Sequence, residues 1–247
     1  MTVVLLLLAA SATALATGLG ALPVYWLGDR VEAWRPALWG AVAGIMAVAS
    51  IQGLVLPGLD EGSDVSLVAG GIVGIVFLAI ARRVFEDHDV EIGSVSGAGA
   101  RRAALVIAVL FVHSLPEGLA LGAAWASGTT GLGVFVFVAI ALQNVPEGTA
   151  TAIPLRDAGT GQSRAFWLAT LTSLPQPIGA LLAYALVEAT HKLLPASFGF
   201  AAGAMLALVA VEVLPVALRR GTRTGGLAGL VAGGASMAVL GVVLGTG

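Results

Sequence analysis

Long apolar stretches alternate with short polar segments along the whole chain. Each stretch has about 20 residues, the length of helix that crosses the hydrocarbon core of a bilayer. The first stretch is interpreted as a span rather than a signal peptide, because no Lys or Arg precedes it. The pattern predicts eight membrane-spanning helices that form a single domain over residues 1–247, at residues 3–22, 36–57, 65–85, 103–126, 130–153, 164–188, 195–218 and 224–246.

The composition supports this class. Hydrophobic residues make up 58% of the chain and charged residues 11%, whereas soluble globular proteins have about 25% charged residues. The mean hydropathy is +0.98. We therefore expect an all-α integral membrane protein. The net charge of −2 suggests no nucleic-acid partner, and the absence of cysteine excludes disulfides and thiolate metal sites.

Basic residues divide unequally between the two sides of the predicted membrane domain. Eleven of the twelve Lys and Arg residues lie in or beside the loops that follow spans 1, 3, 5 and 7, and only Lys192 lies on the opposite side. Cytoplasmic loops are enriched in Lys and Arg. We therefore expect a multi-pass protein of the cell (inner) membrane with both termini extracytoplasmic.

The spans also repeat in inverted order. Segment 40–46 of the second span resembles segment 199–205 of the seventh, and segment 67–71 of the third resembles segment 230–234 of the eighth. The fourth and fifth spans share a Pro-Glu-Gly motif. The members of each pair cross the membrane in opposite directions, so the pattern predicts an inverted 3+2+3 repeat. Transporters with such repeats bind their substrate near the middle of the membrane on interrupted helices.

Two polar hexapeptides lie within the fourth and fifth spans. A glutamate inside a membrane helix is costly and indicates a functional site. A proline frees the carbonyl four residues earlier, so we expect each helix to break there and expose backbone carbonyls. The hexapeptides are His113-Ser114-Leu115-Pro116-Glu117-Gly118 and Gln143-Asn144-Val145-Pro146-Glu147-Gly148.

Four spans place unusual side chains at a common depth. Met46, His113, Gln143 and Gln176 each lie ten to twelve residues from the predicted cytoplasmic end of their span, a depth of about 15–18 Å. Two carboxylates and one neutral imidazole match the charge of one divalent cation, and imidazole suits zinc and other late first-row metals. The set predicts a site near the middle of the membrane for Zn²⁺, Fe²⁺, Mn²⁺ or Cd²⁺.

Several features keep a second interpretation. Met46 is either a ligand or an ordinary core residue, and Glu212 is either a ligand on the cytoplasmic exit route or a structural acid. The acidic loop at 60–64 is a solvated segment or attracts cations at the entrance. The loop at 86–102 is likewise solvated or catches metal on the cytoplasmic side.

The two hexapeptides, the Gly-Ala-Met motif of the seventh span and Gly179-Ala180-Leu181-Leu182 in the sixth resemble the ZIP family of metal transporters. The resemblance implies an eight-helix fold that moves divalent metal, chiefly zinc, into the cytoplasm. It implies an elevator mechanism, in which spans 1, 4, 5 and 6 slide against spans 2, 3, 7 and 8. It also implies two metal positions that share Glu117 and Glu147, with Met46, His113 and Gln143 completing the first and Ser114, Asn144 and Gln176 completing the second.

The second position departs from the family pattern. Ser114 stands where Asn is usual, Asn144 where some members have Asp, and Gln176 where many have Glu. Two divalent ions would bring four positive charges against two carboxylates, which is unfavourable in a medium of low dielectric constant. We expect one tightly held metal ion, with the second position weak or empty.

Two other classes of function compete with transport. The neutral second position favours a non-transporting metal sensor or a structural member of the same fold. An intramembrane metallohydrolase would need H-E-x-x-H, which is absent, and adjacent His113 and Ser114 do not form a Ser–His pair, so we expect no enzyme. The expected partners are a divalent metal ion as substrate and the lipid bilayer, and family members are often homodimers.

Overall fold

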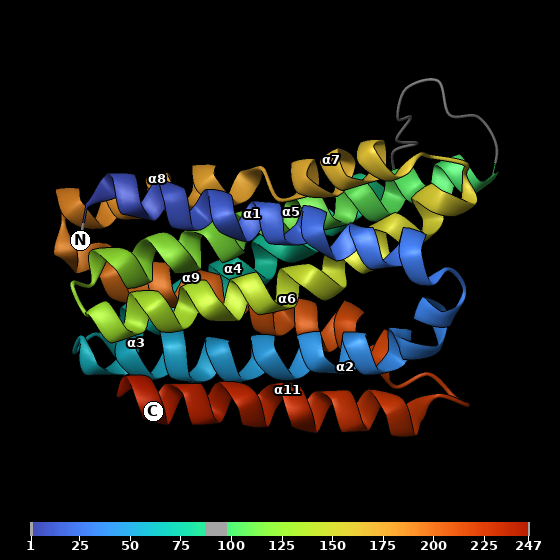
Figure 1. Ribbon diagram of the computed structural model, residues 1–247. Helices are drawn as coiled ribbons and strands as arrows, with labels where there is room; N and C mark the ends of the chain where they lie inside the picture. Colours follow the sequence, from blue (N-terminus) through green and yellow to red (C-terminus); the bar gives the residue numbers. More distant parts are fainter. Residues whose placement is uncertain (1, 87–97, 247) are drawn as a thin grey trace.

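All regular structure in the parts of the chain that the computed structural model describes, residues 2–86 and 98–246, is helical. The helices run side by side, and both ends of the chain lie at the same end of the bundle (Figure 1). Within the described residues, seven helical segments are long and apolar enough to cross a membrane. A further helix, α5 (Ala98–Ala126), has 29 residues. The expected eight-helix membrane protein is confirmed.

Several spans consist of more than one helical segment, and several continue past the predicted bounds into polar residues. In chain order the elements are α1 (Val3–Leu27), α2 (Arg30–Ser50), the π-helical turn η1 (Ile51–Val55), α3 (Leu56–Asp60), α4 (Asp64–Glu86), α5, α6 (Thr130–Asp157), α7 (Gln162–Thr172), α8 (Pro175–Ala189), the 3₁₀ turn η2 (His191–Leu193), α9 (Leu194–Leu208), the π-helical turn η3 (Val209–Val213), α10 (Leu214–Ala217) and α11 (Arg223–Leu244). The acidic loop predicted after Glu86 lies largely outside the described residues.

The prediction that the Pro-Glu-Gly motifs break their helices is wrong. α5 and α6 continue without interruption through Pro116 and Pro146. Interruptions occur instead in neighbouring spans. The sixth span has a gap between α7 and α8 just before Pro175, and π-helical turns lie immediately before the segments that contain Pro57 and Pro215. A wider turn or a short gap absorbs the backbone hydrogen bond that proline cannot make.

The helix pairing follows the inverted repeat. α2 packs mainly on α11 and α4 on α9, while α1 packs mainly on α6 and α5 on α8. Exchanging spans 2 with 7 and 3 with 8 converts the first pair into the second. Exchanging spans 1 with 6 and 4 with 5 relates the other two pairs in the same way. The π-helical turns η1 and η3 also occupy matching places in spans 2 and 7. The predicted inverted repeat is therefore confirmed.

Glycines divide these helices into two groups. A Cβ at Gly20 would overlap the carbonyl of Val145, and a Cβ at Gly44 would overlap the carbonyl of Leu230. Such close backbone contacts join α1 to α6 and α5 to α8, which with α7 we call the site group. They also join α2 to α11 and α4 to α9, which with α3, α10 and the π-helical turns η1 and η3 we call the frame group.

The two groups meet mainly through side chains. Gly53 of η1 faces the side chains of Phe135 and Val136 in α6, and α5 packs against α9 and α4. Among the described glycines, one places its missing Cβ on backbone of the other group: Gly131 of α6 lies against the carbonyl of Leu244 at the end of α11. Close backbone contact therefore holds each group together but hardly joins the two.

Gly229 and Gly225 of α11 test this reading of the glycines. A Cβ at Gly229 would overlap the carbonyl of Ala37, whereas a Cβ at Gly225 would meet only Pro36 Cβ at 3.9 Å. We expect Gly229→Ala to lower stability by about 1–3 kcal/mol, the usual cost of overpacking. Gly225→Ala should be neutral or slightly stabilising, because alanine favours helix. Thermal unfolding of the two detergent-solubilised variants measures these effects. Equal unfolding midpoints would contradict the close backbone contact at Gly229.

Candidate metal centre

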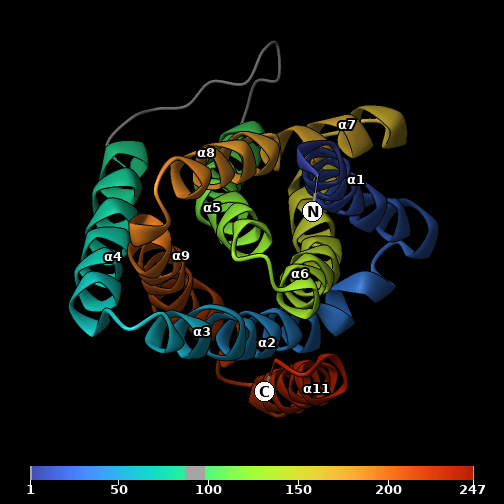
Figure 2. The same ribbon diagram turned by 90° about the vertical axis from the view of Figure 1, so that its left-hand side faces the viewer.

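The predicted ligands lie in the interior, where α5 and α6 run between α8 and α1 on one side and α2 on the other (Figure 2). These polar side chains are buried among mostly apolar neighbours. Met46, Glu117, Gln143, Asn144 and Gln176 have no exposed surface, and Ser114, Glu147 and His113 expose 2%, 4% and 7%.

Glu117 is the centre of a hydrogen-bonded chain. Gln143 Nε2 of α6 donates to Glu117 Oε1 at 2.5 Å, and Gln176 Nε2 of α8 donates to Glu117 Oε2 at 2.6 Å. Each carboxylate oxygen therefore receives one N–H. Because hydrogen bonds to an ionised group are about twice as strong as neutral ones, the two amides fix the carboxylate between α6 and α8.

The other oxygens of this region fit a cation. Glu147 lies close enough to Glu117 for the two carboxylates to repel each other when both are ionised. Gln143 Oε1 is buried and has no hydrogen-bond partner, which is costly for a polar atom in a protein interior. A cation bound here would satisfy the open amide oxygen and offset the repulsion. The donor set thus suits a divalent metal ion near Glu117, Gln143 and Glu147.

The two amides of the predicted second position face each other. Asn144 Nδ2 donates to Gln176 Oε1 at 3.1 Å, and Gln176 Nε2 donates to Asn144 Oδ1 at 3.3 Å. Asn144 Nδ2 also donates to the backbone carbonyl of Thr13 in α1 at 2.7 Å. The Thr13 hydroxyl donates to Gln176 Oε1 at 2.8 Å. These four contacts tie α1, α6 and α8 together beside Glu117.

His113 and Glu212 form a separate pair nearer the arginine-rich end of the bundle. His113 Nε2 lies 3.3 Å from Glu212 Oε2, and Arg82 Nε lies 3.8 Å from Glu212 Oε1. His113 belongs to the site group, whereas Glu212 in η3 and Arg82 in α4 belong to the frame group. The pair therefore bridges the two groups.

The structure brings some predicted ligands together and leaves others apart. Glu117, Gln143, Asn144 and Gln176 share one hydrogen-bonded network, while His113 contacts Glu212 instead. Met46 is buried at the same level in an apolar cluster. Within the described ranges, no three His, Asp or Glu side chains are arranged to hold one ion. The complete first ligand set, with Met46 and His113, stays a prediction.

Sequence reasoning missed the contribution of α1. Thr13 contacts Gln176 and Asn144, and one turn further along α1 the Thr17 hydroxyl shares a hydrogen bond of 2.7 Å with the Ser173 hydroxyl. Two threonines four residues apart on one helix face were the available signal. It is a weak one, because Ser and Thr in helices often bond only to their own backbone carbonyls. Arg82 was likewise recognised only as a basic residue.

These features define a class: a polytopic helical membrane protein with an inverted repeat and two buried carboxylates, Glu117 and Glu147, in its interior. The profile described as the ZIP zinc transporter matches residues 65–241. Zinc transporter ZIPB of Bordetella bronchiseptica is 36% identical over 248 residues, covering 93% of this chain and 78% of the relative. Zinc transporter GufA of Myxococcus xanthus is 33% identical, covering 93% of this chain and 95% of the relative. The chain belongs to the ZIP family, whose members are transporters.

A plant relative is much longer than this chain. A protein of Arabidopsis thaliana is 37% identical over 211 residues, which cover 84% of this chain but 34% of the plant protein. The present chain therefore matches about a third of the length of that relative.

Gln143 offers a test of the open oxygen. Gln143→Leu removes an unpartnered amide oxygen beside Glu117, so zinc affinity should fall by at least about tenfold, equivalent to about 1.4 kcal/mol. Gln52 is the matched control, because its Oε1 is also buried without a partner but lies against Gly241 of α11. Gln52→Leu should leave zinc affinity unchanged. Calorimetric titration of both purified variants gives the comparison, and equal affinities would remove Gln143 from the site.

Proposed function

We propose that the protein carries a divalent metal ion, chiefly zinc, across the membrane into the cytoplasm. The observation that supports this most strongly is the pair of carboxylates, Glu117 and Glu147, buried at mid-depth beside the unpartnered oxygen of Gln143. Isolated ionised carboxylates cost several kcal/mol each in a protein interior. A divalent cation matches their combined charge.

The choice of metal follows from the donors and the relatives. We assign Met46, His113, Glu117, Gln143 and Glu147 as the ligands of the transported ion. Thioether, imidazole, carboxylate and amide donors together suit zinc and neighbouring first-row metals better than the hard ions calcium and magnesium. Relatives covering most of this chain are named as zinc transporters. Fe²⁺, Mn²⁺ and Cd²⁺ remain the competing substrates to compare with zinc.

Glu212 is proposed as the acceptor on the route out. Its side chain is 20% exposed, in contrast to Glu117, and it contacts His113 at 3.3 Å. His113 would bind the ion together with Glu117 and then turn towards Glu212, so that the ion moves from the buried site to the solvated end of the bundle. Arg82 at 3.8 Å from Glu212 compensates its charge when no metal is present.

The direction of transport rests on the distribution of charge. At the end of the bundle opposite the chain termini, arginines lie at the ends of α4 and α6, at the starts of α2, α7 and α11, and in the turn after α10, and Arg156 pairs there with Asp29 at 3.0 Å. Lys192 lies in η2 at the other end. With the arginine-rich end cytoplasmic, both termini are extracytoplasmic and Glu212 faces the cytoplasm, so the exit route leads inward.

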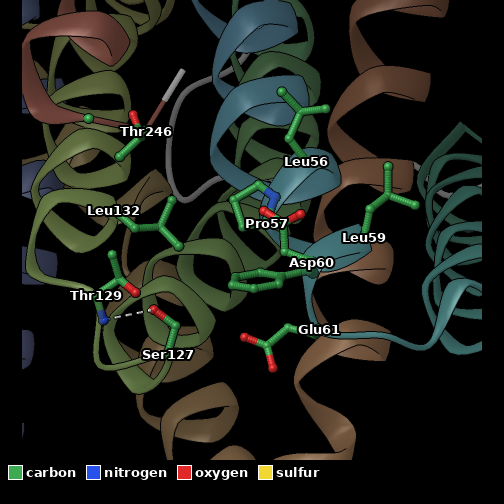
Figure 3. Close-up of a pocket in the computed structure, with 11 residues that line it drawn as sticks. Leu56, Pro57, Leu59, Asp60, Glu61, Ser127, Thr129, Leu132 and Thr246 are labelled. Carbon is green, nitrogen blue, oxygen red and sulfur yellow. Dashed lines mark hydrogen bonds between the residues drawn. The ribbon is translucent and has the colours of Figure 1, made fainter.

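An elevator movement of the site group against the frame group is the mechanism we propose. Close backbone contacts hold each group together, whereas the boundary consists mainly of side-chain contacts that can slide. At the end where the termini lie, the boundary opens into a pocket of about 500 Å³. Glu61 and Leu59 of the frame group line it together with Ser127 and Thr129 of the site group (Figure 3).

The shared carboxylates give the direct test of transport. Glu117→Gln or Glu147→Gln keeps the side-chain volume but removes the charge that the ion requires, so zinc uptake by proteoliposomes should fall to the level of empty vesicles. Glu188→Gln, an exposed acid of α8, is the control and should retain uptake. Uptake near the wild-type level in either site variant would refute the central claim. A wild-type protein that binds zinc without any uptake would instead be a sensor.

The elevator can be tested by tethering the two groups. The chain has no cysteine, so Glu61→Cys with Thr129→Cys can be joined across the pocket by a bis-maleimide reagent. The tethered protein should still bind zinc but lose uptake. Ser63→Cys with Ser66→Cys joins two hydroxyl positions 2.8 Å apart within the frame group, and that tether should leave uptake intact. Undiminished uptake by the Glu61–Thr129 tether would mean that the groups need not move apart.

A further inference from the structure

We propose that Gln176 and Asn144 occupy the second metal position themselves, as a hydrogen-bonded staple held by Thr13 of α1, so that the chain binds a single ion at mid-depth. This proposal rests on the proposed function, because it concerns how many ions bind in the same buried site. We call the surroundings of Glu117, Glu147, Gln143, Asn144 and Gln176 the chamber. It assigns Thr13, which lies outside both polar hexapeptides, as the residue that positions the two amides.

The direction of every hydrogen bond in the staple is fixed from its two ends. The Thr13 carbonyl can only accept, so the atom of Asn144 that lies 2.7 Å from it is the amide nitrogen. The Glu117 carboxylate also accepts when ionised, so the atom of Gln176 that lies 2.6 Å from it is the amide nitrogen. The remaining amide atoms then pair oxygen to nitrogen in both directions. The Thr13 hydroxyl lies 2.8 Å from both Gln176 Oε1 and the Ala10 carbonyl, and its single proton is shared between these two acceptors.

The oxygens that could bind a second metal are therefore already in use. Gln176 Oε1 accepts from the Thr13 hydroxyl and from Asn144 Nδ2, and Asn144 Oδ1 accepts from Gln176 Nε2. Gln143 Oε1 in the same chamber has no partner. One side of Glu117 thus has an open amide oxygen for an ion, whereas on the other side Gln176 directs an N–H group, which repels cations, at the carboxylate. An ion can therefore bind on the Gln143 side of Glu117 but not on the Gln176 side.

Gln176 also stabilises the negative charge of Glu117, as a second cation would. Its N–H points at Glu117 Oε2, the oxygen that a bridging carboxylate would use for the second metal. A polarised N–H stabilises the ionised carboxylate without adding net charge to a medium of low dielectric constant. Two carboxylates with one divalent ion and this donor leave the chamber neutral, whereas a second ion would leave it strongly positive.

The staple joins helices that belong to one group. Thr13, Glu117, Asn144 and Gln176 lie on α1, α5, α6 and α8, all within the site group. A bound metal commonly cross-links elements in this way, and here hydrogen bonds between fully buried side chains take its place. The cross-link would be present in the metal-free protein as well as the loaded one, so the group keeps its shape throughout a transport cycle.

The number of zinc ions bound per chain tests the staple. Zinc would be counted by mass spectrometry on chelator-treated, zinc-saturated protein in nanodiscs, with the Glu117→Gln, Glu147→Gln double variant supplying the background from surface acids. We expect one ion above background in the wild type. Gln176→Glu removes the N–H that faces Glu117, so this variant should bind two. Asn144→Asp, which removes both donors to Thr13 and Gln176, should also bind two and serves if Gln176→Glu fails to fold.

Gln143→Glu is the matched control that separates position from charge. It adds the same negative charge to the same chamber but leaves the staple intact, so we expect one ion. Two ions in Gln143→Glu would show that charge alone limits occupancy and would overturn the staple, as would two ions in the wild type. One ion in both opened variants would overturn it as well. A wild type that binds no zinc above background would instead refute the proposed function.

Discussion

Two carboxylates in the middle of an apolar bundle impose the constraint to which the remainder of this structure responds. Neither Glu117 nor Glu147 has more than a few per cent of its surface exposed, and an uncompensated charge at such depth is strongly unfavourable. Part of the compensation comes from amides whose N–H groups face Glu117, and in the proposed function a divalent cation beside the open oxygen of Gln143 supplies the remainder. Gln143, Asn144 and Gln176 are chemically equivalent groups, yet only Gln143 has its oxygen free.

The site group must also move against the frame group if the bound ion is to reach both sides of the membrane. The glycine contacts suggest how both needs are met. Backbone lies against backbone within the site group and within the frame group, whereas Gly53 meets the side chains of Phe135 and Val136 across the boundary. Helices that meet through side chains can slide past each other in small shear steps, whereas helices with interlocked backbones would first have to separate. Movement is therefore expected between the groups, and the staple and Glu117 would travel together.

Span length and charge segregation, which the bilayer sets, predicted the class and the eight helices, and the matched sequence segments predicted the inverted repeat. These signals failed where neighbouring helices decide the outcome. Pro116 and Pro146 were expected to break their helices, but α5 and α6 continue, and the interruptions occur near Pro57, Pro175 and Pro215. The depth argument correctly indicated that Gln176 reaches the level of Glu117. It could not show which atom of each amide points inward, because that depends on Thr13 of another helix.

The Pro-Glu-Gly motif connects the buried carboxylates with the close packing of the helices. A Cβ at Gly118 would overlap the carbonyl of Gln176, and a Cβ at Gly148 would overlap the carbonyl of Thr17. The glycine after each glutamate thus lets a partner helix approach closely enough for hydrogen bonds to form: the Gln176 side chain of α8 donates to Glu117, and the Thr13 backbone carbonyl of α1 accepts from Asn144. Each motif places a charge on one helix and, in the next residue, removes the side chain that would hold the compensating helix away. Because the motif is repeated in α5 and α6, the chamber is closed from two sides, by α8 and by α1.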